Sequence, residues 1–330
     1  MGYQAAGQQF LSFSLGSRVE RAMSVPTISR ARDLICSMIG GLELSNYTKE
    51  WTGDGFMRRP LEPMGWMDRP DPQVTRNWIM AQTVSDLFFH GRAFWYVASR
   101  YQTGFPASFQ WLPAANVSTP GQAGPYWMGP ASVIELNGVQ IPTDDVVQFL
   151  SPVAGVVTMG ARAIDIAVRL DDAARRFALN QTPAGYLQQT GGEPMNGDEL
   201  AELASAWAEA RTANAVGALN EAVEWREFDA DPSKLQLTEG RQHSSLELSR
   251  VANIPPYLVG VSVGGYTYQN AQQARQDLYL FGARPFIECV EQTLSLDSVT
   301  PRGRVVEFDI DAYLAENAIS DANIREEMAR

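Results

Sequence analysis

The chain has 330 residues, of which 45% are hydrophobic, so it is globular and long enough for two or three subdomains. Its formal net charge is −12 and its pI is near 4.7. This balance disfavours proteins that hold nucleic acid or anionic membrane on a basic surface. Lysine occurs only at Lys49 and Lys234, so arginine supplies most of the positive charge and suits fixed ion pairs at interfaces.

The sequence also argues against membrane insertion and disulfide bonding. No apolar run reaches the ~20 residues that a bilayer-spanning helix requires. The opening MGYQAAGQQF has no secretory-signal pattern, and Ala6 stands where a myristoylation pattern needs Ser or Thr. We therefore expect a soluble protein that works where it is made. Cys36 and Cys289 fall in expected helices, which favours two buried, reduced thiols.

The first half of the chain is expected to form an α+β domain. A polar arm is expected before residue 25, and 45–74 is expected to be a loop rich in Gly, Pro and Asp. Pro26 near a first turn and Thr75 as a cap predict helices over 25–39 and 75–91. Five strands are then expected, at 94–99, 109–112, 133–136, 139–141 and 146–150. Asn137-Gly138 predicts a hairpin between the third and fourth.

The middle of the chain predicts a small acidic module held between two helices. The helices are expected at 161–182 and 232–254. Between them we expect a strand, a helix and a strand, at 186–189, 198–211 and 222–228. From Gly185 to Asp231 there are ten acidic residues against two arginines, which gives this module a net charge of −8.

A loop between two helices is the most informative stretch of the chain. Pro255 ends the helix before it, and Gly260, Gly264 and Gly265 predict a mobile, polar and aromatic loop. A long helix should follow over 269–295, bent by Pro285 near Phe281. A strand at 305–310 and a polar helical segment at 316–330 complete the expected elements. Such a loop is suited to contacting something that moves.

Two patterns raise the possibility of chemistry, and we favour neither. Gly260-Val261-Ser262-Val263-Gly264 matches the G-x-S-x-G nucleophile elbow, which needs a strand before it, a helix after it and a later histidine. His90 and His243 both precede it, so a chance match is favoured, with a serine esterase using Ser262 kept as the alternative. Asp309 and Asp311 would share one face of a strand and could hold a divalent cation, although two solvated acids are the simpler expectation.

Other site patterns are missing from the sequence. There is no P-loop and no Rossmann fingerprint, and the histidines and cysteines lack metal-ligand spacing. We therefore expect no catalytic residues, no metal, no cofactor and no enzymatic activity.

An ordered series of short motifs resembles the portal proteins of tailed bacteriophages, in the version found in many long-tailed phages. The order and spacing agree over roughly residues 20–314. Besides the opening helix over 25–41, the motifs are DRPDP (68–72), HGRAFW (90–95), IPTDDVVQF (141–149), AGYL (184–187), VANIPPYLVG (251–260) and YQNAQQ (268–273). The chain departs from the family at Gln148, where histidine is frequent, and in the short tail after Leu314, which leaves the size of the crown open.

The resemblance implies the portal fold, with a mixed α/β wing, a two-helix stem, a small α/β clip and a long wing helix with a channel loop. It divides the chain into the wing at 1–158, stem helices at 159–184 and 232–254, the clip at 185–231, the channel-loop region at 255–270, the long helix and returning wing strand at 271–314, and the start of the crown at 315–330.

The resemblance also implies a function and partners. The family forms a homo-oligomeric ring, usually a dodecamer, at one capsid vertex, through which double-stranded DNA passes during packaging and ejection. The implied partners are the major capsid protein, the terminase packaging motor and the head-tail adaptor, with assembly in the host cytoplasm and residence in the virion. A scaffold that never contacts DNA is the remaining alternative. The missing P-loop leaves ATP hydrolysis to a partner.

Two sets of residues are carried over as sites. The channel loop that contacts DNA is expected at Ser262, Gly264, Gly265, Tyr266, Thr267, Tyr268, Gln269 and Asn270. The clip residues that dock partners are expected at Glu199, Glu202, Glu209, Glu221 and Glu224. An acidic, lysine-poor chain fits weak and sequence-blind contact with DNA, because tight binding requires many basic side chains on phosphates.

Overall fold

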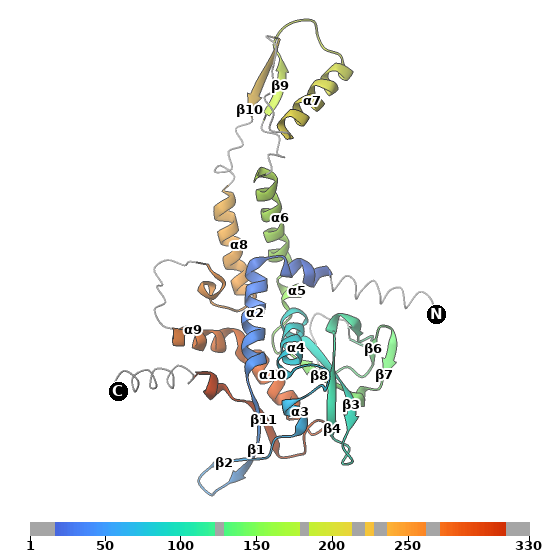
Figure 1. Cartoon of the computed structure of the whole chain (residues 1–330), viewed down its shortest axis with the longest axis vertical. Coiled ribbons are helices and arrows are strands. Elements are labelled where there is room, and N and C mark those ends of the chain that lie inside the picture. Colours follow the sequence, from blue (N-terminus) through green and yellow to red (C-terminus); the bar gives the residue numbers. More distant parts are fainter. Residues whose placement is uncertain are drawn as a thin grey trace, which may run out of the picture. The chain divides into compact units, whose positions relative to one another are not determined.

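The computed structural model describes residues 17–122, 129–178, 185–212, 222–227, 236–261 and 271–314 (Figure 1). The chain divides into two compact units, Met1–Ile164 with Ser245–Arg330, and Asp165–Ser244. Helices and strands are mixed in both units, which confirms the expected α+β class. No helix in these described ranges is long and apolar enough to cross a membrane. The assignment of particular residues to wing, stem, clip and crown stays a prediction.

Two packed helices form one side of the larger unit's core. Helix α2, Pro26–Gly41, buries a stripe at Ile28, Ala31, Ile35 and Ile39 against helix α4, Arg76–His90. The hydroxyl of Thr75 accepts a hydrogen bond from the Trp78 N–H at 3.3 Å and caps α4, as expected. The helix ends at Gly91, whose φ of 72° lies in the left-handed region.

An antiparallel sheet packs against α4 and carries the largest core side chains. Its strands are β3 (Arg92–Arg100), β4 (Pro106–Leu112) and β8 (Val146–Leu150), with β3 in the centre. Trp95 lies fully buried on β3, with its ring centroid 5.2 Å from that of Phe109 and 5.0 Å from that of Phe149. Its indole N–H donates to the Thr83 hydroxyl at 2.7 Å, so this polar atom satisfies its hydrogen bond within the core.

A second, smaller sheet contains the predicted hairpin. Strand β5 (Val117–Ser118) pairs with β6 (Ile134–Leu136), which pairs with β7 (Val139–Ile141). Asn137 and Gly138 have φ values of 50° and 83°, so both occupy the left-handed region that a two-residue hairpin turn requires. Short 3₁₀ turns, η1 at Ala114–Asn116 and η2 at Thr143–Asp145, connect this sheet to β4 and β8.

The side chain of Gln148 on β8 holds the segment that leads into β6. Its amide oxygen accepts from the Ala131 N–H at 2.7 Å, and its amide nitrogen donates to the Ala131 carbonyl at 3.0 Å. Both backbone groups of the buried Ala131 are thus paired by a single side chain, so Gln148 has a clear structural role.

The third sheet shows that one expectation was wrong. Residues 45–74 form strands β1 (Leu44–Trp51) and β2 (Phe56–Pro60) and a short helix, α3 (Gly65–Asp68), rather than a continuous loop. Strand β1 lies in the middle and pairs on its other side with β11 (Arg304–Phe308). The partner strand lies more than 250 residues away, so this stabilisation of β1 has no signature in the local sequence.

The last long helix is interrupted. It consists of α9 (Ala271–Asp277), a π-helical segment η4 (Leu278–Ala283) and α10 (Arg284–Leu294). The helix thus departs from regular α-helical geometry around Phe281, and the expected bend there stays a prediction. Helix α10 packs against β8 and β11. Cys289 on α10 and Cys36 on α2 are free and buried, as expected.

Strand β11 is shorter than expected, which corrects the interpretation of the two aspartates after it. The strand ends at Phe308, and residues 310–314 are helical. Asp309 caps that turn, since its carboxylate accepts from the Ala312 N–H at 2.9 Å. Asp309 and Asp311 therefore do not share a strand face, and no group of three potential metal ligands occurs among the described residues.

The smaller unit has the expected order of elements. Strands β9 (Gly185–Gln189) and β10 (Val223–Glu227) pair antiparallel, and helix α7 (Gly197–Thr212) lies between them in the sequence. The rings of Trp207 on α7 and Trp225 on β10 are 5.3 Å apart. Helix α6 (Ala161–Ala178) and helix α8 (Leu237–Val251) are joined by an ion pair of 2.8 Å between Asp171 and Arg241.

Candidate functional site

The predicted channel-loop residues, from Ser262 to Asn270, lie outside the described residues, so their role stays a prediction. The structure describes the chain on both sides of this loop. Before it comes a 3₁₀ turn, η3 (Pro256–Val259), which ends at Gly260 with a φ of 82°. After it comes α9. The geometry of these two flanks decides how firmly the ends of the loop are held.

Asn253 ends helix α8 in a motif that satisfies the last carbonyls of the helix. Its φ is 52°, in the left-handed region, where asparagine is the most suitable residue after glycine. The Asn253 N–H donates to the Arg250 carbonyl at 3.1 Å, and the Ile254 N–H donates to the Ser249 carbonyl at 3.0 Å. This is the hydrogen-bond pattern of a Schellman motif, and it turns the chain toward Pro255.

The Asn253 side chain reaches the interrupted helix. Its amide nitrogen donates to the carbonyl of Phe281 at 2.6 Å. Pro285 has no N–H, and in a regular α-helix the carbonyl left without a donor would be that of Phe281, four residues earlier. The side chain at the end of α8 thus supplies a donor at the level where the proline removes one.

A second contact joins the same two flanks. The Tyr257 hydroxyl donates to one carboxylate oxygen of Asp277 at 2.9 Å, and the Gln273 amide donates to the other oxygen at 2.8 Å. Asp277 is only 8% exposed, so these bonds satisfy a buried carboxylate. We call the set Asn253, Tyr257, Gln273, Asp277 and Phe281 the loop frame. It holds the chain entering the loop against the chain leaving it.

A glycine beside the loop frame allows two helices to approach closely. A Cβ on Gly160, just before α6, would lie 2.5 Å from a methyl group of Val251 at the end of α8, and 2.8 Å from the Val156 carbonyl of helix α5 (Val156–Met159). No side chain fits there. The start of α6 and the end of α8 therefore meet at a point that only glycine permits.

The acidic residues predicted to dock partners do not all have the same surroundings. The Asn196 carboxamide oxygen accepts from the Asp198 and Glu199 N–H groups, both at 3.0 Å, while the Glu199 carboxylate accepts from the Asn196 N–H at 2.9 Å. This reciprocal capping box engages Glu199 in starting α7. The spacing Asn-x-x-Glu is the sequence signature of this box, although Glu199 was predicted only as a docking residue.

The remaining predicted acids are exposed or undescribed. Glu202 and Glu209 are exposed on α7 and stand seven residues apart, so they lie on one face of the helix. Glu224 on β10 pairs with Arg226 at 3.5 Å. Glu221 lies outside the described residues. Of the five acids, Glu202 and Glu209 are the pair whose carboxylates the structure leaves exposed on one helix face.

The perturbed ionisable groups of α4 serve the core of the larger unit. Burial raises the pKa of Asp86 to about 7, although its carboxylate accepts from the Trp111 indole at 2.9 Å and the Ala114 N–H at 3.0 Å. Burial, and secondarily Arg92, lowers the pKa of His90 to about 4. Arg92 donates to the Thr119 hydroxyl at 2.8 Å and the Val117 carbonyl at 3.1 Å. The bonds of Asp86 connect α4 to β4 and η1, and those of Arg92 connect β3 to β5.

The structure does not provide the context of a nucleophile elbow around Ser262. The residues before Gly260 form a 3₁₀ turn rather than a strand. His90 is held in the core near Arg92, and His243 lies on α8 before the loop. Among the described residues, the strand that a nucleophile elbow needs before its serine is thus absent, and a 3₁₀ turn stands in its place.

Comparison with known proteins gives a consistent result. Residues 26–330 match the family described as "Phage portal protein". The "Probable portal protein" of Streptomyces phage phiC31 is 23% identical over 322 residues, covering 88% of this chain and 68% of that protein.

Solved structures share the fold. The crystal structure of an HK97 family phage portal protein from Corynebacterium diphtheriae aligns with a TM-score of 0.72 and 23% identity, covering 89% of this chain and 96% of the other. A chain from the neck of a native gene transfer agent (GTA) particle, computed with C12 symmetry, aligns with a TM-score of 0.64 and 16% identity, covering 94% and 88%. With a profile match over more than nine-tenths of its length and the same fold in these structures, the chain belongs to the phage portal protein family.

Proposed function

We propose that this protein forms a ring at one vertex of a phage capsid and conducts double-stranded DNA into the capsid and out of it. The observation that carries the proposal is the family match over residues 26–330, together with a fold shared along nearly the whole chain with portal proteins. A relative in the neck of a particle computed with C12 symmetry supports a ring of twelve copies.

The loop frame supports a DNA-contacting role for the residues that it holds. A loop that contacts a moving duplex needs fixed ends and weak, uncharged contact groups. The frame fixes the ends through the Asn253–Phe281 and Tyr257–Asp277 hydrogen bonds. Between them, Tyr266, Tyr268, Gln269 and Asn270 supply aromatic faces and neutral hydrogen-bonding groups. We assign 262–270 as the narrow part of the channel.

The acidic module supports docking of the packaging motor and, later, of the head-tail connector. Its net charge of −8 favours a basic partner surface, because complementary charge speeds and orients association. Chemical work is assigned to a partner, since the sequence has no P-loop and the family is structural. The major capsid protein is the proposed neighbour of the ring in the virion.

The experiment that tests this function is imaging of the purified full-length protein. Negative-stain electron microscopy and native mass spectrometry should both show a closed ring of about twelve copies, the number suggested by the C12 neck. The ring should restore DNA filling to capsids assembled without a portal. A stable monomer or dimer at all concentrations, or rings whose capsids never fill, would contradict the proposal.

A further inference from the structure

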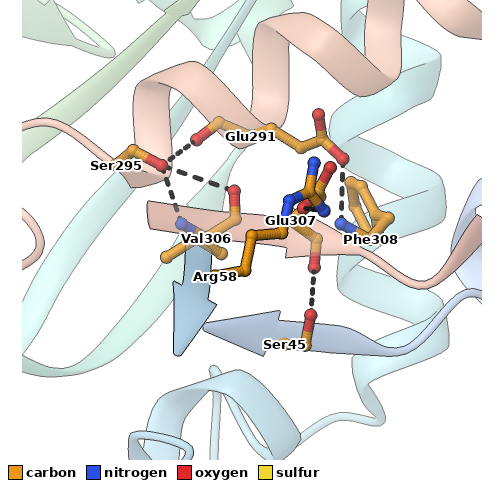
Figure 2. A network of polar contacts seen from close by, with 7 residues as sticks. All are labelled: Ser45, Arg58, Glu291, Ser295, Val306, Glu307 and Phe308. Atoms are coloured by element: carbon orange, nitrogen blue, oxygen red, sulfur yellow. Dashed lines mark hydrogen bonds and ion pairs between the residues drawn. The ribbon is translucent and has the colours of Figure 1, made fainter. Parts of the chain in front are cut away.

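The sheet β11-β1-β2 has one closed edge. Figure 2 shows how α10 covers the outer side of β11: the Val306 N–H donates to the Ser295 hydroxyl at 2.9 Å, and the Phe308 N–H donates to the Glu291 carboxylate at 2.8 Å. The remaining outward N–H of the strand, that of Arg304, donates to the Pro301 carbonyl at 3.1 Å. No outward N–H of β11 is left for another strand.

The opposite edge of the same sheet is open. Strand β2 pairs only with β1 within the described residues, and all five of its residues are exposed. The tip of the β1–β2 hairpin carries large apolar side chains in solvent, with Trp51 64%, Phe56 71% and Met57 54% exposed. The rings of Trp51 and Phe56 contact each other edge-on at 5.0 Å, so they form one presented aromatic pair. We call Trp51, Phe56 and Met57 the hairpin tip.

The edge of β2 is built against strand addition, although its tip is apolar. Arg58 and Arg59 occupy the strand and Pro60 ends it, which are the residue types that discourage edge-to-edge pairing. Since β11 has no free outward N–H, β2 of one copy cannot extend its sheet by pairing with β11 of the next. A partner must therefore contact the tip through side chains.

The charge around the hairpin tip indicates what kind of partner fits. Residues 44–60 contain three basic residues against two acidic ones, in a chain with a net charge of −12. Arg58 pairs with Glu307 at 2.6 Å and Arg59 with Glu50 at 3.0 Å, whereas Lys49 makes no ion pair in the described part of the chain. Lys49 thus lies beside an apolar tip as a cation available to an acidic group of a partner, and a second copy of this chain, with its net charge of −12, offers such groups.

We propose that the hairpin tip docks on the neighbouring copy and forms one half of the contact between subunits. The inference rests on the proposed ring and names the surface that makes it. A closed ring needs a heterologous contact, in which one surface of each copy meets a different surface of the next. The two edges of this sheet are such different surfaces, because the β11 edge is closed and the β2 edge is open. The aromatic pair supplies the apolar anchor, and Lys49 supplies the charge at its rim.

The test is a comparison of ring assembly in two matched variants. W51S/F56S removes the aromatic pair, and Val139→Ser removes an equally exposed side chain, 69%, from the unrelated hairpin β6–β7. Native mass spectrometry across a dilution series should show wild type and V139S as rings. W51S/F56S should assemble only at a concentration at least about tenfold higher, because anchors of this type dominate interfaces. Circular dichroism and thermal unfolding should show that the variant monomer is folded.

A photo-crosslinking amino acid in place of Phe56 identifies the occupant directly. Cross-links between two copies of the chain, mapped by mass spectrometry, would support the inference. Cross-links to the capsid protein or to DNA alone, or rings of W51S/F56S that form at the wild-type concentration, would overturn it while leaving the proposed ring standing. A wild-type protein that never forms rings would overturn the proposed function as well, so the two failures are distinguishable.

Discussion

Asn253 has two roles that other residues cannot combine. Its backbone adopts the left-handed conformation that ends α8, and its side chain donates to the Phe281 carbonyl of the interrupted helix. Glycine would allow the conformation but remove the donor, and most other residues would also strain the backbone. One residue thereby couples the end of one helix to the middle of another, on either side of the proposed channel loop.

We predict that Asn253→Asp lowers the free energy of unfolding by about 1 kcal/mol, because aspartate tolerates the left-handed conformation but cannot donate when ionised. Urea denaturation at pH 7 measures the change. Asn137→Asp is the matched control, since Asn137 has a similar φ of 50° in an exposed turn and should tolerate the change. Equal losses in both variants would show that the Asn253–Phe281 hydrogen bond contributes nothing measurable.

Glu291 gives the larger unit a specific pH dependence. Burial, and secondarily Glu307, raises the pKa of its carboxyl group from 4.5 to about 7, against the opposing effect of the Phe308 N–H. Between these two pH values the folded chain binds more protons at Glu291 than the unfolded chain does. Its contribution to the free energy of unfolding is therefore largest below pH 4.5 and falls as the pH rises to about 7.

We predict that Glu291→Gln reduces this dependence and raises the melting temperature at pH 8, because the amide oxygen still accepts from Phe308 without carrying charge. Melting temperatures at pH 5 and pH 8 give the comparison. Asp86 and His90 titrate in wild type and variant alike, so their effects cancel. Glu62→Gln, an exposed change at a carboxylate that is not among the groups shifting the pKa of Glu291, should leave the pH dependence unaltered. A Glu291→Gln protein that loses stability at pH 8 would contradict this account.

Among the elements, α7 carries structural and exposed acids side by side. Glu199 closes the capping box with Asn196, while Glu202 and Glu209 project from one exposed face. The number of acidic residues on α7 therefore overstates the acidic surface that a partner could contact, because Glu199 is engaged in the cap. The two functions lie within the first four turns of one helix.

We predict that Glu199→Ala lowers the stability of the smaller unit by about 1 kcal/mol, because it removes half of a capping box. E202A/E209A should leave stability within about 0.5 kcal/mol of wild type, as surface changes usually do. Denaturation followed through the Trp207–Trp225 pair reports on this unit. Association with the packaging motor should weaken in E202A/E209A. If instead E199A alone weakened it at full helix content, the docking face would have been misassigned.

The sequence alone predicted the elements that are fixed by contacts between neighbouring residues, and it missed those fixed by contacts between distant residues. The hairpin at Asn137-Gly138 was predicted because both turn residues carry its signal themselves. The strands β1 and β2 were missed because β1 is fixed by β11, more than 250 residues later, amid a composition typical of loops. The loop frame was also missed: Pro255 marked its position, but the Tyr257–Asp277 contact depends on the tertiary approach of two helices.

In the proposed ring, a substitution in the proposed channel loop would be present once in every subunit, so its effect on DNA would be multiplied. We predict that Q269R/N270R slows or stalls DNA packaging while rings still form, because arginines would add phosphate contacts at the narrowest point. Raising the salt concentration should partly relieve the stall, since phosphate contacts weaken steeply with salt.

Translocation rates of single packaging complexes at two salt concentrations provide the measurement. Q269S/N270S is the neutral control and should package at close to the wild-type rate. Arginine variants that form rings and package normally at low salt would exclude the loop from the channel wall. Failure of these variants to form rings would place the loop between neighbouring subunits instead.

The π-helical segment Leu278–Ala283 sets how far α9 is rotated about the helix axis relative to α10. A π-helical turn accommodates one residue more than an α-helical turn. Each residue of an α-helix turns the chain by about 100° and advances it by about 1.5 Å. Loss of one residue from this segment would thus leave α10 seated on its strands and rotate α9, with the attached end of the channel loop, by roughly a quarter turn. The π-helical segment therefore sets the direction in which the chain leaves α9 toward the proposed channel loop, and in the proposed ring this direction would be the same in every subunit.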